Sequence, residues 1–461
     1  MGTARFDAII IGTGQAGPSL AVRLARAGQR VAIVERDRFG GTCVNTGCVP
    51  TKTLVASAYA AHLARRADEY GVSTGPVSVD MKRVKARMDR VSGRSREGVE
   101  KLLRSTANIS VYRGHARFSG PQRVVVDGES LEAERIFVNV GGRPGARGID
   151  GADRVPHLTS SSMMDVDFVP EHLIVVGGSY IGLEFGQMYR RFGSRVSIVE
   201  MGPRLIGRED EDVSQEVKAI VEREGIEVRL DAKCLSLAPH PQGVSVQVKC
   251  SVGAPDIVGS HVLLAVGRTP NTDDLGLETA GIKTDARGNI VVNDRLETSA
   301  PGIWALGDCN GRGAFTHTAY NDYEIVAANL LDGEGRKVTD RITAYALYID
   351  PPLGRAGMTE AEALREGHDV LVGKRPMTRV GRAVEKGETQ GFMKVVVDAR
   401  SKAILGAAIL GVGGDEVVHA VLDAMYAGAP YTTVQRAMHI HPTVAELVPT
   451  VLGELKPVQL G

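Results

Sequence analysis

The chain has 461 residues, more than a single hydrophobic core normally holds, so two to four domains are expected. Its 55 basic and 55 acidic residues balance, which gives no reason to expect nucleic acid or a membrane surface as a partner. No run approaches the roughly 18 apolar residues that span a bilayer. The first predicted strand, residues 6–11, leaves no room for a signal peptide, so a cytoplasmic protein is expected.

The first predicted element is a β-α-β unit. Strand residues 6–11 lead into Gly12, Gly14 and Gly17, a helix follows, and a second strand ends at Glu35. In such units the first glycine permits a tight turn, the helix N-terminus faces a pyrophosphate, and the carboxylate accepts hydrogen bonds from ribose hydroxyls. The pattern therefore predicts a dinucleotide site.

A close pair of cysteines, Cys43 and Cys48, follows directly before a predicted helix. The chain has five cysteines, too few for a disulfide scaffold, and a close pair in the cytoplasm is more often catalytic or metal-binding. Four intervening residues allow a disulfide, Pro50 suits a first helical turn, and the helix dipole with Lys52 favours a thiolate. Zinc would require four ligands, and no second cysteine pair is present. We therefore expect a redox pair and no metal.

A long helical segment, residues 50–105, is predicted next. The chain then returns through Ala116 to a strand at 136–140 and a turn at Gly142. These elements complete the first nucleotide-binding unit.

A second β-α-β unit repeats the first. Strand residues 173–176 lead into Gly177, Ser179 and Gly182, then a helix and a strand ending at Glu200. The acidic residue follows the first glycine by the same interval in both copies, so a second dinucleotide site is predicted. Ser179 stands where a glycine is usual, and a looser backbone approach is expected there.

The second unit closes at Gly267, and the chain re-enters the first domain at residues 298–308, which include Asp308. From about residue 340, strands are expected near Tyr345, Ile349 and residues 370–372, 391–397 and 403–409. Helices are expected from residue 415 to the end. This pattern favours a separate α+β domain.

Over essentially its whole length, the sequence resembles the class I pyridine nucleotide–disulfide oxidoreductases, which include glutathione reductase, dihydrolipoamide dehydrogenase and mercuric reductase. The resemblance implies an α/β fold with two Rossmann-like dinucleotide-binding domains, for FAD and NAD(P), and a C-terminal α+β dimerisation domain. The expected boundaries are 1–148 for the FAD domain, 149–270 for the NAD(P) domain, 271–338 for a segment completing the FAD domain, and 339–461 for the dimerisation domain.

The resemblance also implies roles for individual residues. Cys48 contacts the flavin as the charge-transfer thiol, Cys43 attacks the substrate, Lys52 and Glu184 pair near the flavin N5, and Tyr180 gates the nicotinamide pocket. The expected cofactor-binding residues are Gly12, Gly14, Gly17, Glu35, Thr42, Lys52, Ala116, Gly142, Asp308, Gly177, Tyr180, Ile181, Glu200 and Gly267.

Near the C-terminus, His441 precedes a proline and lies five residues before Glu446. A histidine held by a carboxylate can move a proton to and from a departing thiol. The resemblance implies that His441 is the acid–base, that Glu446 orients it, and that it reaches the thiols of the other subunit in a homodimer. His439 is interpreted as structural.

The nucleotide and the substrate are predicted less directly. Glu200 accepts ribose hydroxyls and repels a 2′-phosphate, which favours NADH over NADPH, although Arg204 and Arg208 lie nearby. The expected reaction passes electrons from NADH through FAD to the thiol pair and on to a small thiol or disulfide substrate.

Two alternatives stay open for the acceptor: the dihydrolipoamide dehydrogenase of a multienzyme complex, and a metal-ion reductase like mercuric reductase. Residues 12–52 and 374–382 favour the mercuric type. The histidine–proline motif, and a C-terminal sequence without the vicinal cysteines of that type, disfavour it. Seven basic residues between Lys82 and Arg96 suggest an anionic disulfide.

Overall fold

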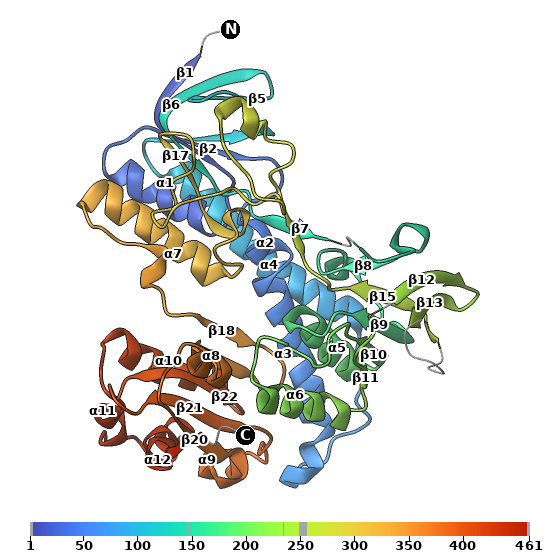
Figure 1. The fold of residues 1–461 in the computed structure, drawn as a ribbon. Coiled ribbons are helices and arrows are strands. Elements are labelled where there is room, and N and C mark those ends of the chain that lie inside the picture. Colours follow the sequence, from blue (N-terminus) through green and yellow to red (C-terminus); the bar gives the residue numbers. More distant parts are fainter. Residues whose placement is uncertain (1–2, 146–147, 234, 249–255, 459–461) are drawn as a thin grey trace.

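The computed structural model describes residues 3–145, 148–233, 235–248 and 256–458. Three sheets organise it, with the first at one end, the second beside the long central helices, and the C-terminal one packed below (Figure 1). None of the helices within the described ranges is long and apolar enough to cross a membrane.

The first sheet has the strand order β3-β2-β1-β6-β5-β4, and β17 also pairs with β6. Strands β3, β2, β1, β6 and β17 are parallel, whereas β4, β5 and β6 form an antiparallel meander. The bounds are β1 (Ala4–Ile11), β2 (Val31–Glu35), β3 (Ile109–Arg113), β4 (Ala116–Gly120), β5 (Arg123–Val126), β6 (Glu129–Val138) and β17 (Ile303–Ala305).

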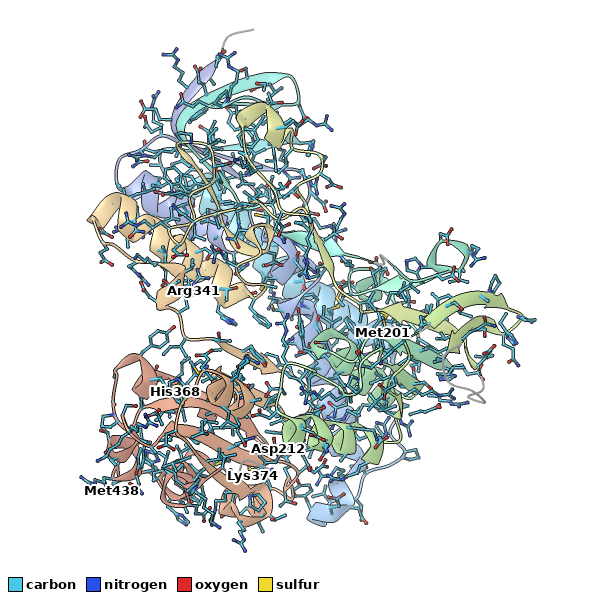
Figure 2. All side chains as sticks on the ribbon, viewed as in Figure 1. Met201, Asp212, Arg341, His368, Lys374 and Met438 are labelled. Carbon is cyan, nitrogen blue, oxygen red and sulfur yellow. The ribbon has the colours of Figure 1, made fainter. Side chains whose placement is uncertain are left out.

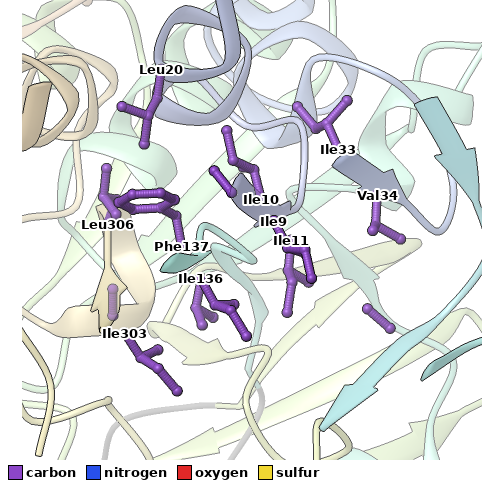
Figure 3. Packing of buried hydrophobic residues seen from close by; sticks show 14 of the residues in the cluster. Ile9, Ile10, Ile11, Leu20, Ile33, Val34, Ile136, Phe137, Ile303 and Leu306 are labelled. Atoms are coloured by element: carbon purple, nitrogen blue, oxygen red, sulfur yellow. The ribbon is translucent and has the colours of Figure 1, made fainter. Parts of the chain in front are cut away.

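Buried aliphatic residues of β1, β2 and β6 form the first core. Ile9, Ile10 and Phe137 are fully buried, and Leu20 of helix α1 packs on them together with Leu306 beyond β17 (Figure 3). Near-continuous apolar strands are typical of a parallel sheet that is covered on both faces. The helices of this region are α1 (Ala16–Arg26), α2 (Gly41–Asn45), α3 (Cys48–Arg65), α4 (Met81–Ser105) and α7 (Thr316–Ala327).

The expectation of one helical segment over residues 50–105 is wrong. The structure has two helices, α3 and α4, separated by residues 66–80. Gly71 adopts a left-handed φ of 73°, and Asp80 caps α4 by accepting a hydrogen bond from the Arg83 N–H at 3.1 Å. The two helices pack side by side, which places α4 next to the helix that begins at Cys48.

The second sheet is parallel, with the order β11-β10-β9-β15-β8. A three-stranded antiparallel sheet, β12-β13-β14, lies beside it, and the short ribbon of β7 and β16 connects the two nucleotide-binding regions. The bounds are β7 (Gly142–Pro144), β8 (Leu158–Thr159), β9 (His172–Val176), α5 (Tyr180–Phe192), β10 (Arg195–Val199), α6 (Glu211–Arg223), β11 (Glu227–Arg229), β12 (Leu235–His240), β13 (Gly243–Val248), β14 (Ile257–Gly259), β15 (His261–Leu264) and β16 (Arg268–Pro270).

The C-terminal sheet is antiparallel, with the order β18-β19-β22-β21-β20-β23. Its elements are β18 (Ala344–Leu347), β19 (Leu353–Gly357), α8 (Glu360–Arg365), β20 (Val370–Pro376), α9 (Gly381–Glu385), β21 (Phe392–Asp398), β22 (Ile404–Leu410), α10 (Gly414–Tyr426), α11 (Tyr431–Gln435), α12 (Val448–Gly453) and β23 (Lys456–Pro457).

The expectation of helix from residue 415 to the end is only partly met. Residues 437–444, all within the described chain, form neither helix nor strand, and β23 returns to pair with β20. The His441–Pro442 peptide is cis, and proline at this position cannot continue a hydrogen-bonded helix.

Ion pairs join the second sheet region to the C-terminal domain. Arg355 of β19 pairs with Glu209, and both side chains are almost fully buried. Lys374 of β20 lies 2.7 Å from Asp212, and the two residues face each other across the boundary in Figure 2. These contacts hold β18 and β19 beside the site described next.

Candidate active site

One cavity of about 1320 Å³ lies where the two nucleotide-binding regions and β18 meet. Most of the residues that the sequence singles out line it. They are Gly12, Gly14, Glu35, Thr42, Cys43, Cys48, Lys52, Ala116, Gly142, Tyr180, Ile181, Glu184 and Asp308.

The remaining predicted residues lie outside this lining. Gly17 packs within the first glycine turn, and Gly177 and Glu200 lie at the head of the second β-α-β unit. Gly267 lies between β15 and β16, where its carbonyl accepts a hydrogen bond from Gly145 N–H at 3.1 Å. His441 and Glu446 lie on the C-terminal domain and are described below.

The two glycine turns have the same construction. Gly12 has a φ of 101°, and a Cβ at Gly17 would lie 2.4 Å from the Gly12 carbonyl oxygen. In the second copy Gly177 has a φ of 113°, and a Cβ at Gly182 would lie 1.9 Å from the Gly177 oxygen. Helix and turn approach so closely that only glycine fits at these positions. Ser179 has a φ of −98° and extended backbone that any residue adopts.

Each acidic residue braces its own glycine turn. Glu35 accepts hydrogen bonds from the Thr13 N–H at 3.1 Å and the Thr13 hydroxyl at 2.5 Å. Glu200 accepts from the Gly178 N–H at 2.6 Å and the Gly202 N–H at 2.8 Å. A carboxylate has about four acceptor positions, so each retains capacity for ribose hydroxyls.

Asn139 is a structural residue of the first turn that the sequence analysis missed. Its Oδ1 accepts from the Gly17 N–H at 3.0 Å, and its Nδ2 donates to the Leu306 carbonyl at 2.9 Å. It thereby joins the glycine turn, the end of β6 and the segment after β17. In the sequence, a polar residue directly after an apolar strand was the signal that could have identified Asn139.

The two cysteines lie on different helices. Cys43 is inside α2, Cys48 begins α3, and both are free thiols. A hydrogen bond from Cys43 is the main cause that lowers the pKa of Cys48 to about 6. Burial opposes this shift, while Thr316 and the Lys52 charge add to it. The same hydrogen bond, with burial, raises the pKa of Cys43 far above its usual range. Cys48 is therefore the thiolate of the pair at neutral pH.

An ion pair lies next to the thiols. Lys52 Nζ is 2.7 Å from Glu184 Oε2, and the Glu184 side chain is 4% exposed. The other carboxylate oxygen accepts from the Tyr348 N–H at 3.0 Å, and Lys52 Nζ lies 4.6 Å from the Tyr348 ring centroid. The pair joins α3 to α5, and thus the two nucleotide-binding regions.

Asp308 lies in the cavity wall, where burial raises its pKa above the ordinary range. Arg268 lies 3.5 Å from it, donates to the Gly142 carbonyl, and reaches Thr42 Oγ1 at 3.3 Å. The sequence analysis did not single out Arg268, although it directly follows Gly267.

Two aromatic residues and a threonine form part of the cavity wall. The Tyr180 ring centroid lies 5.6 Å from that of Phe315. Thr316, the first residue of α7, places its Oγ1 3.2 Å from Cys48 Sγ. The sequence analysis assigned Thr316 no role.

His441 and Glu446 meet each other but not the cavity. His441 Nδ1 lies 3.0 Å from Glu446 Oε2, while the histidine side chain is 78% exposed. The neighbouring Met438 and Ile440 are 98% and 80% exposed, and Figure 2 shows Met438 at the outer edge of the C-terminal domain. The predicted dyad is therefore assembled on a surface away from the thiols of its own chain.

The residues present fit a flavin dinucleotide at the first site. The close packing of Gly17 on Gly12, the braced Glu35 and the large cavity provide a pyrophosphate turn, a ribose acceptor and space for a ring system. Gly177 and Glu200 repeat the arrangement for a second nucleotide.

Two family models match nearly all of the chain. The pyridine nucleotide-disulphide oxidoreductase model matches residues 6–322, and the dimerisation domain of the same family matches residues 343–452. The chain belongs to the pyridine nucleotide–disulphide oxidoreductase family. It is an FAD-dependent enzyme that uses a pyridine nucleotide and acts on sulfur groups, and its dimerisation domain supports a homodimer. The predicted family and fold class are confirmed.

The similar proteins differ in their named activities. Dihydrolipoyl dehydrogenase of Thermus scotoductus is 35% identical over 444 residues, which cover 96% of this chain and 95% of that protein. The probable pyridine nucleotide-disulfide oxidoreductase RclA of Escherichia coli is 36% identical, with 96% and 97% covered. Mercuric reductase of Streptomyces lividans is 33% identical, with 96% and 94% covered.

A solved structure is similar along its whole length. It is the copper(II) complex of the HOCl-induced flavoprotein disulfide reductase RclA from Escherichia coli, with a TM-score of 0.89 and 34% identity. The match covers 98% of this chain and 99% of that one.

Proposed function

We propose that this enzyme uses NADH to reduce a small disulfide through Cys43 and Cys48, with His441 of the partner subunit as the proton donor. The observation that carries the proposal is the placement of both thiols and the Lys52–Glu184 pair in one cavity, with Cys48 as the thiolate. FAD, when bound, would accept a hydride from the nicotinamide and supply two electrons to the Cys43–Cys48 disulfide, which yields the two thiols.

The preference for NADH rests on Glu200. Its carboxylate is fixed by two backbone N–H groups at the head of the second turn, where it would accept ribose hydroxyls and repel a 2′-phosphate. The nearby Arg204 donates to the Gly207 carbonyl, so at least part of its guanidinium is engaged by the loop itself.

The thiols divide the exchange chemistry between them. Once the pair is reduced, the proton of Cys43 passes to His441. The Cys43 sulfur then attacks one sulfur of the substrate and forms a mixed disulfide, and the other substrate sulfur leaves as a thiolate. Protonation of that thiolate by His441 releases the first thiol product. Cys48 then attacks Cys43, which re-forms the internal disulfide and releases the second thiol. The low pKa of Cys48 suits this resolving step.

The partner subunit is needed because His441 projects from the C-terminal domain and does not line the cavity of its own chain. Glu446, whose side chain is 15% exposed, fixes the ring through Nδ1 and leaves Nε2 to face a substrate. A homodimer that brings this exposed segment to the thiols of the other chain would complete two composite sites.

The substrate class is supported by the basic residues of α4. Arg96 Nη1 lies 3.5 Å from Oδ1 of Asn45, two residues after Cys43 on α2. Arg90 and Arg94 are exposed on the same helix and have no acidic partner within the described part of the chain. Positive charge near α2, the helix that carries Cys43, favours an anionic disulfide over a neutral one.

A second candidate is reduction of a soft metal ion at the same thiols. It is favoured by the likeness to an RclA structure that is a copper(II) complex and to a mercuric reductase, because thiolates are preferred ligands of soft ions. Such a reaction would not need His441.

The test is NADH oxidation by the FAD-loaded dimer against lipoamide, glutathione disulfide, other small disulfides, Cu(II) and Hg(II). The proposal expects turnover with one disulfide that is lost in both Cys48→Ser and His441→Ala. Turnover with metal ions alone, unchanged in His441→Ala, would replace the disulfide assignment with the second candidate.

A further inference from the structure

Thr316 contacts a reacting atom although it lies far from the thiols in the sequence. Its Oγ1 is 3.2 Å from Cys48 Sγ, and it begins α7. The charged and titratable groups around the same sulfur are Cys43 from α2, Lys52 from α3, Glu184 from α5 and Tyr348 after β18. The Thr316 hydroxyl is an uncharged group within hydrogen-bonding distance of this sulfur.

Strand β18 of the C-terminal domain holds Thr316 in place through its two neighbours. The Phe315 ring stacks on the Tyr345 ring, with centroids 5.7 Å apart and planes at 9°. His317 Nε2 lies 2.7 Å from the Ala344 carbonyl oxygen. With both flanking residues fixed, the hydroxyl of Thr316 has little freedom to turn away from the sulfur.

We propose that Thr316 donates a hydrogen bond to Cys48 and thereby stabilises the reduced pair, with its thiolate, over the disulfide. This inference rests on the proposed function, since it concerns the same two thiols. A hydroxyl bonds more strongly to an anionic acceptor than to a neutral one, and a disulfide sulfur is neutral.

The redox consequence follows from the balance of the step. Oxidation of the pair forms the Cys43–Cys48 sulfur–sulfur bond, releases two electrons to the substrate disulfide, and releases the proton held by Cys43. The hydrogen bond from Thr316 loses its anionic acceptor in that step. It therefore favours the reduced state, as in other dithiols whose thiolate is stabilised.

The experiment uses the FAD-loaded dimer carrying Cys43→Ser, in which a hydroxyl still donates to Cys48. The ionisation of Cys48 is followed against pH by the long-wavelength absorbance of a thiolate beside an oxidised flavin. As a second readout, the alkylation rate of the Cys48 peptide is measured by mass spectrometry. Adding Thr316→Val is expected to raise the ionisation midpoint of Cys48 by about one pH unit. Adding Thr316→Ser instead, which keeps a hydroxyl, is expected to leave that midpoint at the value of the Cys43→Ser protein.

Thr298→Val is the matched control, because the Thr298 hydroxyl bonds to Ala300 within its own turn and lies outside the cavity lining. The ionisation midpoint of Cys48 in this variant should equal that of the parent protein. In a protein that keeps Cys43, Thr316→Val should shift the equilibrium with a dithiol buffer about tenfold toward the Cys43–Cys48 disulfide. This corresponds to a change of about 30 mV in the reduction potential of the pair. A Thr316→Val midpoint equal to the parent's, or an equal shift in Thr298→Val, would overturn the inference. Because no readout needs turnover, failure of the proposed function would show separately, as no NADH-dependent disulfide reduction by the parent.

Discussion

Lys52 on α3 and Glu184 on α5 form an ion pair at 2.7 Å that joins the two nucleotide-binding regions beside the thiols. The carboxylate side chain is 4% exposed, whereas the lysine side chain is 33% exposed. The two partners therefore contribute unequally, because only the glutamate is fully removed from water.

Removing the lysine should leave the buried carboxylate without its partner. Lys52→Met is expected to lower the free energy of unfolding by about 1–3 kcal/mol, less than for a fully buried pair because the ammonium is partly hydrated. Urea denaturation measures this loss of stability. The control is Lys85→Met, since Lys85 pairs with Asp89 on the surface of α4. Equal losses in the two variants would show that the Lys52–Glu184 pair has no special role.

The thiolate makes the stability of the reduced protein depend on pH. The pKa of Cys48 falls from an unfolded value of 9.0 to about 6, so between these values the unfolded chain binds the extra proton. Stability relative to Cys48→Ser should therefore rise as pH increases from about 6 to about 9, and be lost as pH falls through about 6. Denaturant midpoints under reducing conditions test this, and a pH-independent difference would contradict it.

The sequence predicted the parts of the fold that have local patterns. Each β-α-β unit has its glycine turn and acidic strand end within about thirty residues, so Gly12 with Glu35 and Gly177 with Glu200 were recognisable. The break between α3 and α4 was missed, although Gly71 and Asp80 are ordinary stop and start signals.

Contacts between distant segments had no such pattern. Thr316 meets Cys48 across 268 positions, and Arg355 pairs with Glu209 across 146. These partners are chosen by the packing of β18 and β19 against the nucleotide-binding regions, which no short window of sequence encodes. Asn139 was likewise missed because its role is to join segments that meet only in the folded chain.

The basic residues of α4 should set the affinity for an anionic substrate. Replacing Arg90, Arg94 and Arg96 with glutamine is expected to raise KM roughly tenfold at low salt, with a smaller effect at high salt, because exposed charges are screened. The control is Lys82→Gln with Arg83→Gln, which lie about 10 to 20 Å away along the same helix. An unchanged KM, or an equal change in the control, would remove the anionic substrate from the account.

The nucleotide preference should depend on Glu200. Glu200→Ala is expected to lower kcat/KM for NADH roughly tenfold or more, through lost ribose contacts and a loosened turn. The value for NADPH should change less, because the repulsion of its 2′-phosphate is also removed. Steady-state kinetics with both nucleotides measure the ratio. A wild-type enzyme that prefers NADPH would show that Glu200 has been misinterpreted.

The composite site is tested most directly by mixing two inactive variants, Cys48→Ser and His441→Ala, and allowing their subunits to exchange. If His441 serves the thiols of the other chain, each mixed dimer contains one intact site, and random pairing should restore about one quarter of wild-type disulfide reduction. If each chain completed its own site, no mixed dimer would have an intact one, and activity would stay at the level of the parent variants.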